Sequence, residues 1–124
     1  MSNHQSDRFM IIVNDAKTRV EELKPSQVKK NVDEDEQVVL LDVREREDWE
    51  NAHISGADHL SRGVLEKEIE RKLPNIDTNL ILYSENGSIS LLAADSLQKM
   101  GYNNIKSLSG GFQSWLAAGY PIEH

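Results

Sequence analysis

The sequence contains no cysteine among its 124 residues. A chain without cysteine forms no disulfide, no thiolate zinc site and no iron–sulfur cluster, and it has no thiol nucleophile. Long apolar runs are also missing, since nothing approaches the roughly 18 continuous apolar residues of a membrane span. The N-terminus has no basic patch followed by an apolar run. We therefore expect a cytoplasmic protein that does no thiol chemistry unaided and has no membrane partner.

Positive charge is scarce as well. The chain has 14 Lys and Arg residues against 21 Asp and Glu residues, a formal net charge of -7. Nucleic-acid binding depends on clustered Lys and Arg, so this balance argues against a nucleic-acid partner. The acidic run at residues 33–36 predicts a solvated turn, because the Gly and spaced oxygen ligands of a calcium loop are absent. We expect neither a metal nor a cofactor.

The length suits one compact domain with a hydrophobic core. Apolar runs at residues 38–43, 80–83 and 105–108 predict buried strands. Helical patterns lie between and after them, at residues 46–51, 65–73, 93–100 and 112–116. Such alternation predicts an α/β fold with a mostly parallel sheet covered on both faces. In such sheets the ligand crevice lies outside the carboxyl ends of the strands.

An amphipathic helix is predicted at residues 7–17, with Ser6 or Asp7 available as its cap. We treat residues 1–18 as an N-terminal helical extension and residues 19–124 as the main domain. Packing of the helix on that domain is expected, with dimerisation as the alternative, so the chain would be a monomer or a weak dimer. The apolar stripe of this helix comprises Phe9, Ile12, Val13, Ala16 and Val20.

Two further local expectations concern the later helices. Ser61 is placed to cap the helix that carries Leu65. The last helix is expected to carry Phe112, Trp115 and Leu116 on one side.

The segment after the strand at residues 80–83 is the candidate for chemistry. Backbone N–H groups at a helix start are unpaired, and a Gly-containing turn curls them into a cradle for negative charge. Ser84, the first residue after the strand, is expected at the floor of that cradle. This active-site-like loop comprises Ser84, Glu85, Asn86, Gly87, Ser88, Ile89 and Ser90.

Three motifs elsewhere in the chain occur in a recognisable order. Residues 41–45 are LDVRE, residues 53–57 are HISGA, and residues 101–121 contain GY, LSGGF, W and AGYP. They resemble the DVRE, HIPGA and GY…L.GG…W…AG.P signatures of the rhodanese-like family, with Ser55 in place of Pro. The resemblance extends over roughly residues 20–122. It implies a rhodanese-like α/β fold with a central, mostly parallel five-stranded sheet and helices on both faces.

The resemblance also identifies what the loop lacks. Family members that transfer sulfur carry a Cys-x-x-Gly-x-Arg-Ser loop, in which the Cys accepts sulfane sulfur as a persulfide. On this pattern Gly87 and Ser90 match, Ser84 stands at the Cys position and Ile89 at the Arg position. A single engineered Cys-to-Ser change would have left the Arg in place, so Ile89 favours natural divergence.

The two replacements remove the groups that do the chemistry. A hydroxyl lacks the acidity of a thiol, whose usual pKa is about 8.5, and forms no stable analogue of a persulfide. Ile89 supplies no cation for an oxyanion, and Glu85 adds negative charge beside the cradle. Asp42 and Arg44, at the end of a predicted strand, are expected to hold neighbouring turns by hydrogen bonds.

These observations favour a catalytically degenerate rhodanese-like module, with a protein or a small anionic ligand as its partner and a regulatory role. One alternative is a sulfurtransferase that acts on sulfane sulfur, represented here by a Cys-to-Ser variant. Another is a hydrolase in which Ser84 attacks with His53 or His59 as its general base. A phosphatase of the Cys-x5-Arg class is disfavoured, because its thiolate and its Arg are both missing.

Overall fold

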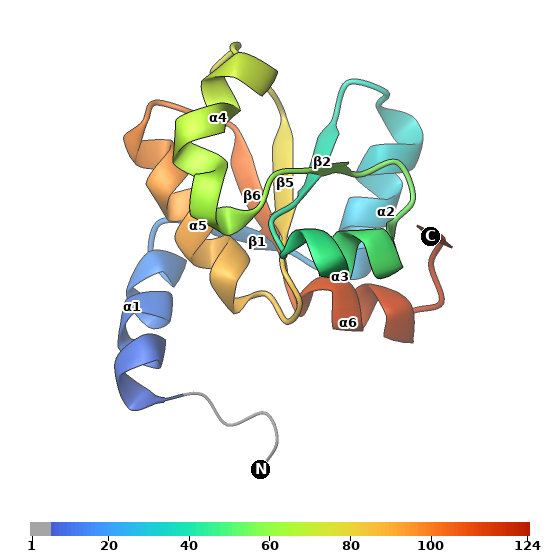
Figure 1. The fold of residues 1–124 in the computed structure, drawn as a ribbon, viewed down its shortest axis with the longest axis horizontal. Helices are drawn as coiled ribbons and strands as arrows, with labels where there is room; N and C mark the ends of the chain where they lie inside the picture. Colours follow the sequence, from blue (N-terminus) through green and yellow to red (C-terminus); the bar gives the residue numbers. More distant parts are fainter. Residues whose placement is uncertain (1–5) are drawn as a thin grey trace.

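Five parallel strands form the central sheet of the protein, seen here in a computed structural model that describes residues 6–124. The order of the strands across the sheet is β1-β6-β5-β2-β4, which confirms the predicted α/β fold (Figure 1). A separate antiparallel pair joins β3 to β7. The strands are β1 (Glu21–Leu23), β2 (Val39–Asp42), β3 (His53–Ile54), β4 (Asp58–His59), β5 (Leu80–Tyr83), β6 (Ile105–Leu108) and β7 (Ile122–Glu123).

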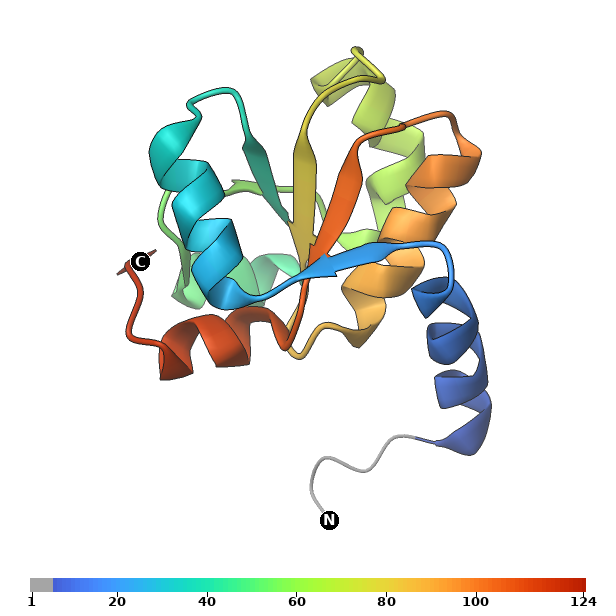
Figure 2. The ribbon, with the colours of Figure 1, turned by 180° about the vertical axis from the view of Figure 1, so that it is seen from behind.

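Helices cover both faces of the sheet (Figures 1 and 2). The first core cluster packs α1, α4 and α5 against one face, and the second packs α2 and α6 against the other. Within residues 6–124, no helix is both long and apolar enough to cross a membrane. The helices are α1 (Asp7–Lys17), α2 (Pro25–Glu34), α3 (Arg46–Asn51), α4 (Leu65–Lys72), α5 (Ser88–Lys99) and α6 (Gly111–Ala117), with a short 3-10 turn, η1 (Arg62–Val64), before α4.

Strand β5 lies at the middle of the sheet, between β2 and β6. All four of its side chains are buried, because helices cover both faces at this point. Successive strand side chains point to opposite faces. Leu80 and Leu82 therefore join the first core cluster, while Ile81 and Tyr83 join the second. A continuous apolar run without alternation is what this position requires.

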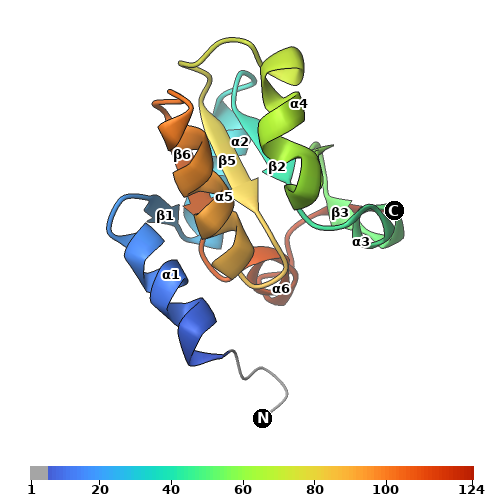
Figure 3. The same cartoon turned by 60° about the vertical axis from the view of Figure 1, so that its left-hand side comes forward.

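The N-terminal helix α1 packs on the domain rather than standing apart (Figure 3). The Ser6 side chain accepts a hydrogen bond from the Phe9 N–H and caps the helix, as predicted. Val13 and Ala16 are fully buried in the first core cluster, on the side that faces α5. Ile12 was predicted to belong to the packed stripe, but it is 52% exposed, so this prediction is wrong. Phe9 and Met10 also pack against this cluster, so the buried face is centred near Val13, and Ile12, about 100° away around the helix, lies outside it.

An ion pair reinforces the contact between α1 and α5. The Arg19 guanidinium donates to both carboxylate oxygens of Asp95, at 2.8 and 2.9 Å, and to Asp15 at 2.7 Å. Arg19 holds the pKa of the Asp95 carboxyl below its usual value. The helix is therefore attached to the domain by both apolar packing and charge.

Three local predictions are corrected by the structure. Ser61 does not cap α4, because η1 intervenes and the Ser61 hydroxyl lies 3.4 Å from the His59 ring instead. Leu116 is 45% exposed, because α6 buries one face that carries Phe112 and Trp115. The acidic run is solvated throughout, but its first two residues continue α2 and only the last two leave the helix.

We expect Leu82→Ala to lower the free energy of unfolding by about 2–5 kcal/mol, because a fully buried side chain of the central strand is lost and leaves a cavity. Urea denaturation followed by circular dichroism measures the change. The matched control is Leu116→Ala, which removes the same atoms from an exposed position and should change stability by less than about 0.5 kcal/mol. Equal losses for the two variants would contradict the placement of β5 at the centre of the core.

Candidate functional site

The active-site-like loop begins at the carboxyl end of β5, where Tyr83 leads into Ser84. Gly87 precedes α5 with a φ of 96°, a left-handed conformation that favours glycine. A Cβ at this position would also lie 3.0 Å from the backbone nitrogen of Gly110. The loop therefore turns tightly into the helix at the edge of the sheet where the sequence predicts a ligand crevice.

Ser84 itself lies inside this turn and is only 2% exposed. Its Oγ accepts hydrogen bonds from the N–H groups of Gly87 at 3.2 Å and Ser90 at 3.1 Å. It donates to the Ser90 hydroxyl at 3.2 Å, and that hydroxyl also contacts Ser107 Oγ at 2.8 Å. The two N–H groups thus converge on the Ser84 side chain. The group positioned to receive the Ser84 proton is another hydroxyl, which is no general base.

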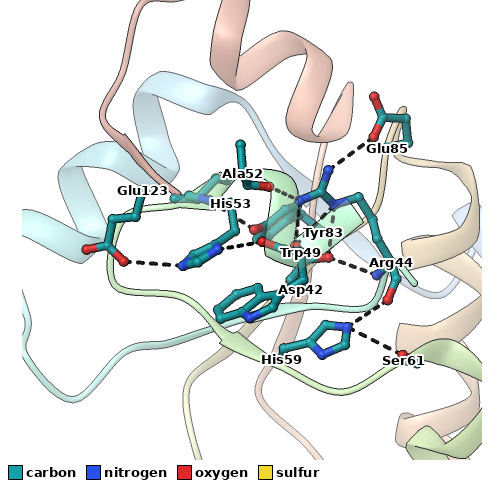
Figure 4. Close-up of polar contacts among 11 residues, drawn as sticks. Asp42, Arg44, Trp49, Ala52, His53, His59, Ser61, Tyr83, Glu85 and Glu123 are labelled. Carbon is teal, nitrogen blue, oxygen red and sulfur yellow. Dashed lines mark hydrogen bonds and ion pairs between the residues drawn. The ribbon is translucent and has the colours of Figure 1, made fainter. Parts of the chain in front are cut away.

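The two histidines considered as bases for Ser84 make their contacts with other groups (Figure 4). The Nδ1 atom of His53 lies 2.8 Å from the Trp49 carbonyl, and its Nε2 lies 3.3 Å from Glu123. The His53 ring also stacks on the Trp49 ring with centroids 3.4 Å apart. His59 Nε2 contacts the Arg44 carbonyl at 2.8 Å. Both imidazoles hold the structure around α3 and β4, and no contact of either with Ser84 is present in the described part of the chain.

A buried ion pair lies beside the loop, at the end of β2 (Figure 4). Arg44 contacts both carboxylate oxygens of Asp42 and donates to the Ala52 carbonyl at 2.6 Å. Burial opposes the charge of the guanidinium, but Asp42, with smaller contributions from Tyr83 and Glu85, outweighs this effect and raises the pKa of Arg44. The two residues hold neighbouring turns together, as predicted.

Arg44 also connects the loop to the last helix. Its Nη1 lies 3.3 Å from a carboxylate oxygen of Glu85, and its guanidinium carbon lies 4.1 Å from the centre of the Phe112 ring. The Phe112 N–H donates to the Ser84 carbonyl at 2.8 Å. Gly111 permits this approach, because a Cβ there would lie 2.4 Å from the same carbonyl oxygen.

A pocket of about 280 Å³ opens next to Ser84. Four of its lining residues belong to the predicted site, namely Arg44, Ser84, Glu85 and Ile89, and four do not, namely Val43, Glu45, Asp48 and Arg62. Arg62 follows the carboxyl end of β4, so a prediction of that short strand would have pointed to it.

The remaining loop residues point elsewhere. Asn86, Gly87 and Ser88 line a different hollow, shared with Met10 and Val13 of α1. Ser90 is fully buried behind the loop. Within the described residues 6–124, no group of three or more His, Asp or Glu side chains is placed to hold a metal ion.

Residues 24–118 match the family model of the rhodanese-like domain. The chain belongs to the rhodanese-like family. This assignment accords with the motifs at residues 41–45, 53–57 and 101–121 and with the five-stranded parallel sheet. Helix α1 and strand β1 precede the matched region.

Several relatives within the rhodanese-like family extend the comparison. YrkF of Bacillus subtilis is 36% identical over 87 residues, and the chain spans about half of its length (46%). The thiosulfate sulfurtransferase GlpE of Coxiella burnetii is 32% identical over 80 residues, which are 64% of this chain and 73% of GlpE.

Solved structures of similar proteins have the same fold along most of the chain. RPA3614 of Rhodopseudomonas palustris, a protein of unknown function, is 27% identical with a TM-score of 0.79 and 99% coverage of both chains. The polysulfide-sulfur transferase homodimer of Wolinella succinogenes is 24% identical with a TM-score of 0.80, covering 94% of this chain and 87% of that one. The rhodanese-like fold of the present chain thus coexists with a loop that lacks the sulfur nucleophile.

We expect Asp42→Asn to lower the free energy of unfolding by about 3–5 kcal/mol, because it leaves the Arg44 guanidinium buried without its counterion. Chemical denaturation measures the loss. Asp58→Asn makes the same change at an exposed position on the neighbouring strand β4 and serves as the control, with an expected change below about 0.5 kcal/mol. A loss no larger than that of the control would show that the buried pair is unimportant for stability.

Alkaline pH should destabilise the protein through Tyr83. Burial, followed by the nearby Asp42 carboxylate, raises the pKa of Tyr83 far above its usual value. The stabilisation is therefore complete below the unfolded-state pKa near 10 and is lost as the pH rises further, by up to about 1.4 kcal/mol per pH unit. Urea unfolding between about pH 9 and 11 should show a shallower decline for Tyr83→Phe than for the unmodified chain. Parallel declines would refute this assignment.

Proposed function

We propose that the chain is a rhodanese-like binding module without sulfurtransferase activity, in which the pocket beside Ser84 receives a ligand or a partner group. The observation that carries the proposal is the state of Ser84, whose buried Oγ accepts two loop N–H groups and donates to a hydroxyl. A persulfide forms when a thiolate attacks sulfane sulfur, and this oxygen has neither the polarisability nor the acidity for that step.

The surroundings of Ser84 support the same proposal. A sulfane donor such as thiosulfate is an anion and needs a cation at the pocket. Ile89 supplies a hydrocarbon there, and the Arg44 guanidinium is already neutralised by Asp42. Hydrogen bonds of Ser84 and Ser90 hold the loop of this chain in place, so the module offers a stable pocket of defined shape. We propose a regulatory role for it.

The alternative is a sulfurtransferase activity like that named for GlpE, with Ser84 at the place of the nucleophile. The geometry that favours it is the pair of N–H groups of Gly87 and Ser90, which converge on the γ atom of residue 84. Such donors stabilise a thiolate when a cysteine stands there. Variants of this loop can therefore test directly which side-chain atoms sulfur transfer requires.

We expect the unmodified chain to show no turnover of thiosulfate and cyanide above a Ser84→Ala control. The double variant Ser84→Cys with Ile89→Arg should gain one sulfur atom on incubation with thiosulfate, because a thiolate and a cation are then both present. The thiolate attacks the sulfane sulfur, the S–S bond of thiosulfate breaks, and sulfite leaves with the bonding electron pair. Intact-protein mass spectrometry before and after reduction measures the bound sulfur. The single variant Ile89→Arg is the control for charge alone and should remain unmodified.

Two outcomes would count against the proposal. Turnover by the unmodified chain, abolished in Ser84→Ala, would make Ser84 a working nucleophile. Full activity of Ser84→Cys alone would favour the alternative, because the Arg position would then be dispensable.

A further inference from the structure

The two arginines that line the pocket are both neutralised by acids of their own. Arg44 is paired with both carboxylate oxygens of Asp42. Arg62 Nη1 contacts the two carboxylate oxygens of Glu66 at 2.8 and 2.7 Å, and Ser96 donates to the same carboxylate at 2.6 Å. Neither guanidinium is therefore an available positive charge for an incoming anion.

The acids that line the pocket are not neutralised in the same way. Within the described part of the chain, no ion pair within 4.0 Å involves Glu45 or Asp48, and both residues are exposed. The Glu85 side chain is 54% exposed, and its carboxylate contacts the already paired Arg44 at 3.3 Å and the neutral Gln113 amide at 3.5 Å. Exposed carboxylates are negatively charged at neutral pH. The pocket thus has a net excess of negative charge at its rim.

Between these acids the pocket has apolar walls. Val43 is buried at the end of β2, and Ile89 is 37% exposed at the first turn of α5. An aliphatic chain that covers Ile89 would remove apolar surface from water, which contributes about 25 cal/mol per Å². A ligand that fits both features has a hydrocarbon stem and a positively charged end.

We propose that this pocket binds an ammonium or guanidinium group carried on an aliphatic stem, as in the side chain of a lysine or an arginine. The inference rests on the proposed function, since it names the ligand chemistry of the same site. The three carboxylates Glu45, Asp48 and Glu85 attract the charged end, and Val43 and Ile89 contact the stem. The same carboxylates repel a small oxyanion. The N–H groups of Gly87 and Ser90 that would bind it already donate to Ser84 Oγ.

The test is an NMR titration of the full chain, labelled with ¹⁵N, at low salt. The probes are n-butylguanidinium, a capped peptide with a single arginine between glycines, the same peptide with glutamine in its place, and thiosulfate. We expect saturable shifts of the pocket amides, including those of Val43 and Ile89, with the two cationic probes only. Raising the salt should weaken binding, because exposed charges are screened.

A matched pair of variants separates the pocket from the overall charge. Glu45→Gln removes a carboxylate that lines the pocket, whereas Glu47→Gln removes one from the exposed surface of α3 outside it. We expect Glu45→Gln to raise the dissociation constant about two- to five-fold, in the range of single exposed charge pairs. Glu47→Gln should leave it nearly unchanged. Ile89→Arg should abolish binding of both cationic probes.

The outcomes are distinguishable from those of the sulfur-transfer assay. Equal effects of the two glutamine variants would overturn the inference, and so would saturable binding of thiosulfate without binding of the cations. If the chain is also inactive in the thiosulfate assay, the proposed function still holds. Turnover of thiosulfate by the unmodified chain would contradict both the inference and the proposed function. A peptide that binds about tenfold tighter than butylguanidinium would identify a polypeptide as the source of the cation, and equal affinities would identify a free small cation.

Discussion

The buried pair of Asp42 and Arg44 is the interaction on which the rest of the site depends. The guanidinium contacts the end of β2 through Asp42, the segment after α3 through the Ala52 carbonyl, and the active-site-like loop through Glu85. It also lies over the Phe112 ring of α6. Parallel strands bring these segments to one edge of the sheet, where backbone hydrogen bonds join the start of α6 to the active-site-like loop, as from the Phe112 N–H to the Ser84 carbonyl. The contact of this edge with the segment after α3 is made by a side chain. One planar, multiply donating side chain supplies that connection.

Because Arg44 holds the fold in this way, it is unavailable to a ligand. A guanidinium that is released toward an anion would leave the Asp42 carboxylate buried without its counterion, and breaking a buried pair costs about 3–5 kcal/mol. An exposed contact with a small anion returns far less than that. The Arg44 charge beside the loop thus has a structural role. The exposed acids around the pocket then determine its electrostatic potential.

Structure could be predicted from the sequence where a residue pattern has a single physical cause. The apolar run at residues 80–83 has no alternation because both faces are covered, and its bounds agree with β5. Ser84 could be placed at the floor of the loop because a residue directly after a strand has a determined position. Ile12 and Leu116 were misplaced because an apolar residue at helical spacing says nothing about how wide the neighbouring surface is.

The pocket lining was only half predictable for a related reason. Asp48 and Arg62 come from α3 and η1, and Glu45 directly precedes α3; these segments meet the loop only after the chain has folded. Glu45 ends the motif at residues 41–45, but that motif indicates the family and not a contact with the loop, and the short strand before Arg62 was not predicted. The role of Ser84 as an acceptor for two N–H groups likewise depends on the closure of the turn, and the sequence predicted the cradle but not that the serine itself occupies it.

The residues that shape the loop are different from those that would do chemistry in it. Gly87 and Gly111 are required by backbone conformation and close approach, and Ser90 joins the loop to Ser107. Ser84 accepts hydrogen bonds at its carbonyl and at its Oγ, whereas Ile89 contributes its side chain to the pocket wall. The serine oxygen at position 84 therefore accepts the N–H groups of the closed turn, while neither side chain supplies a thiolate or a cation. The rhodanese-like fold can in this way be kept around a pocket for which we propose a preference for cations.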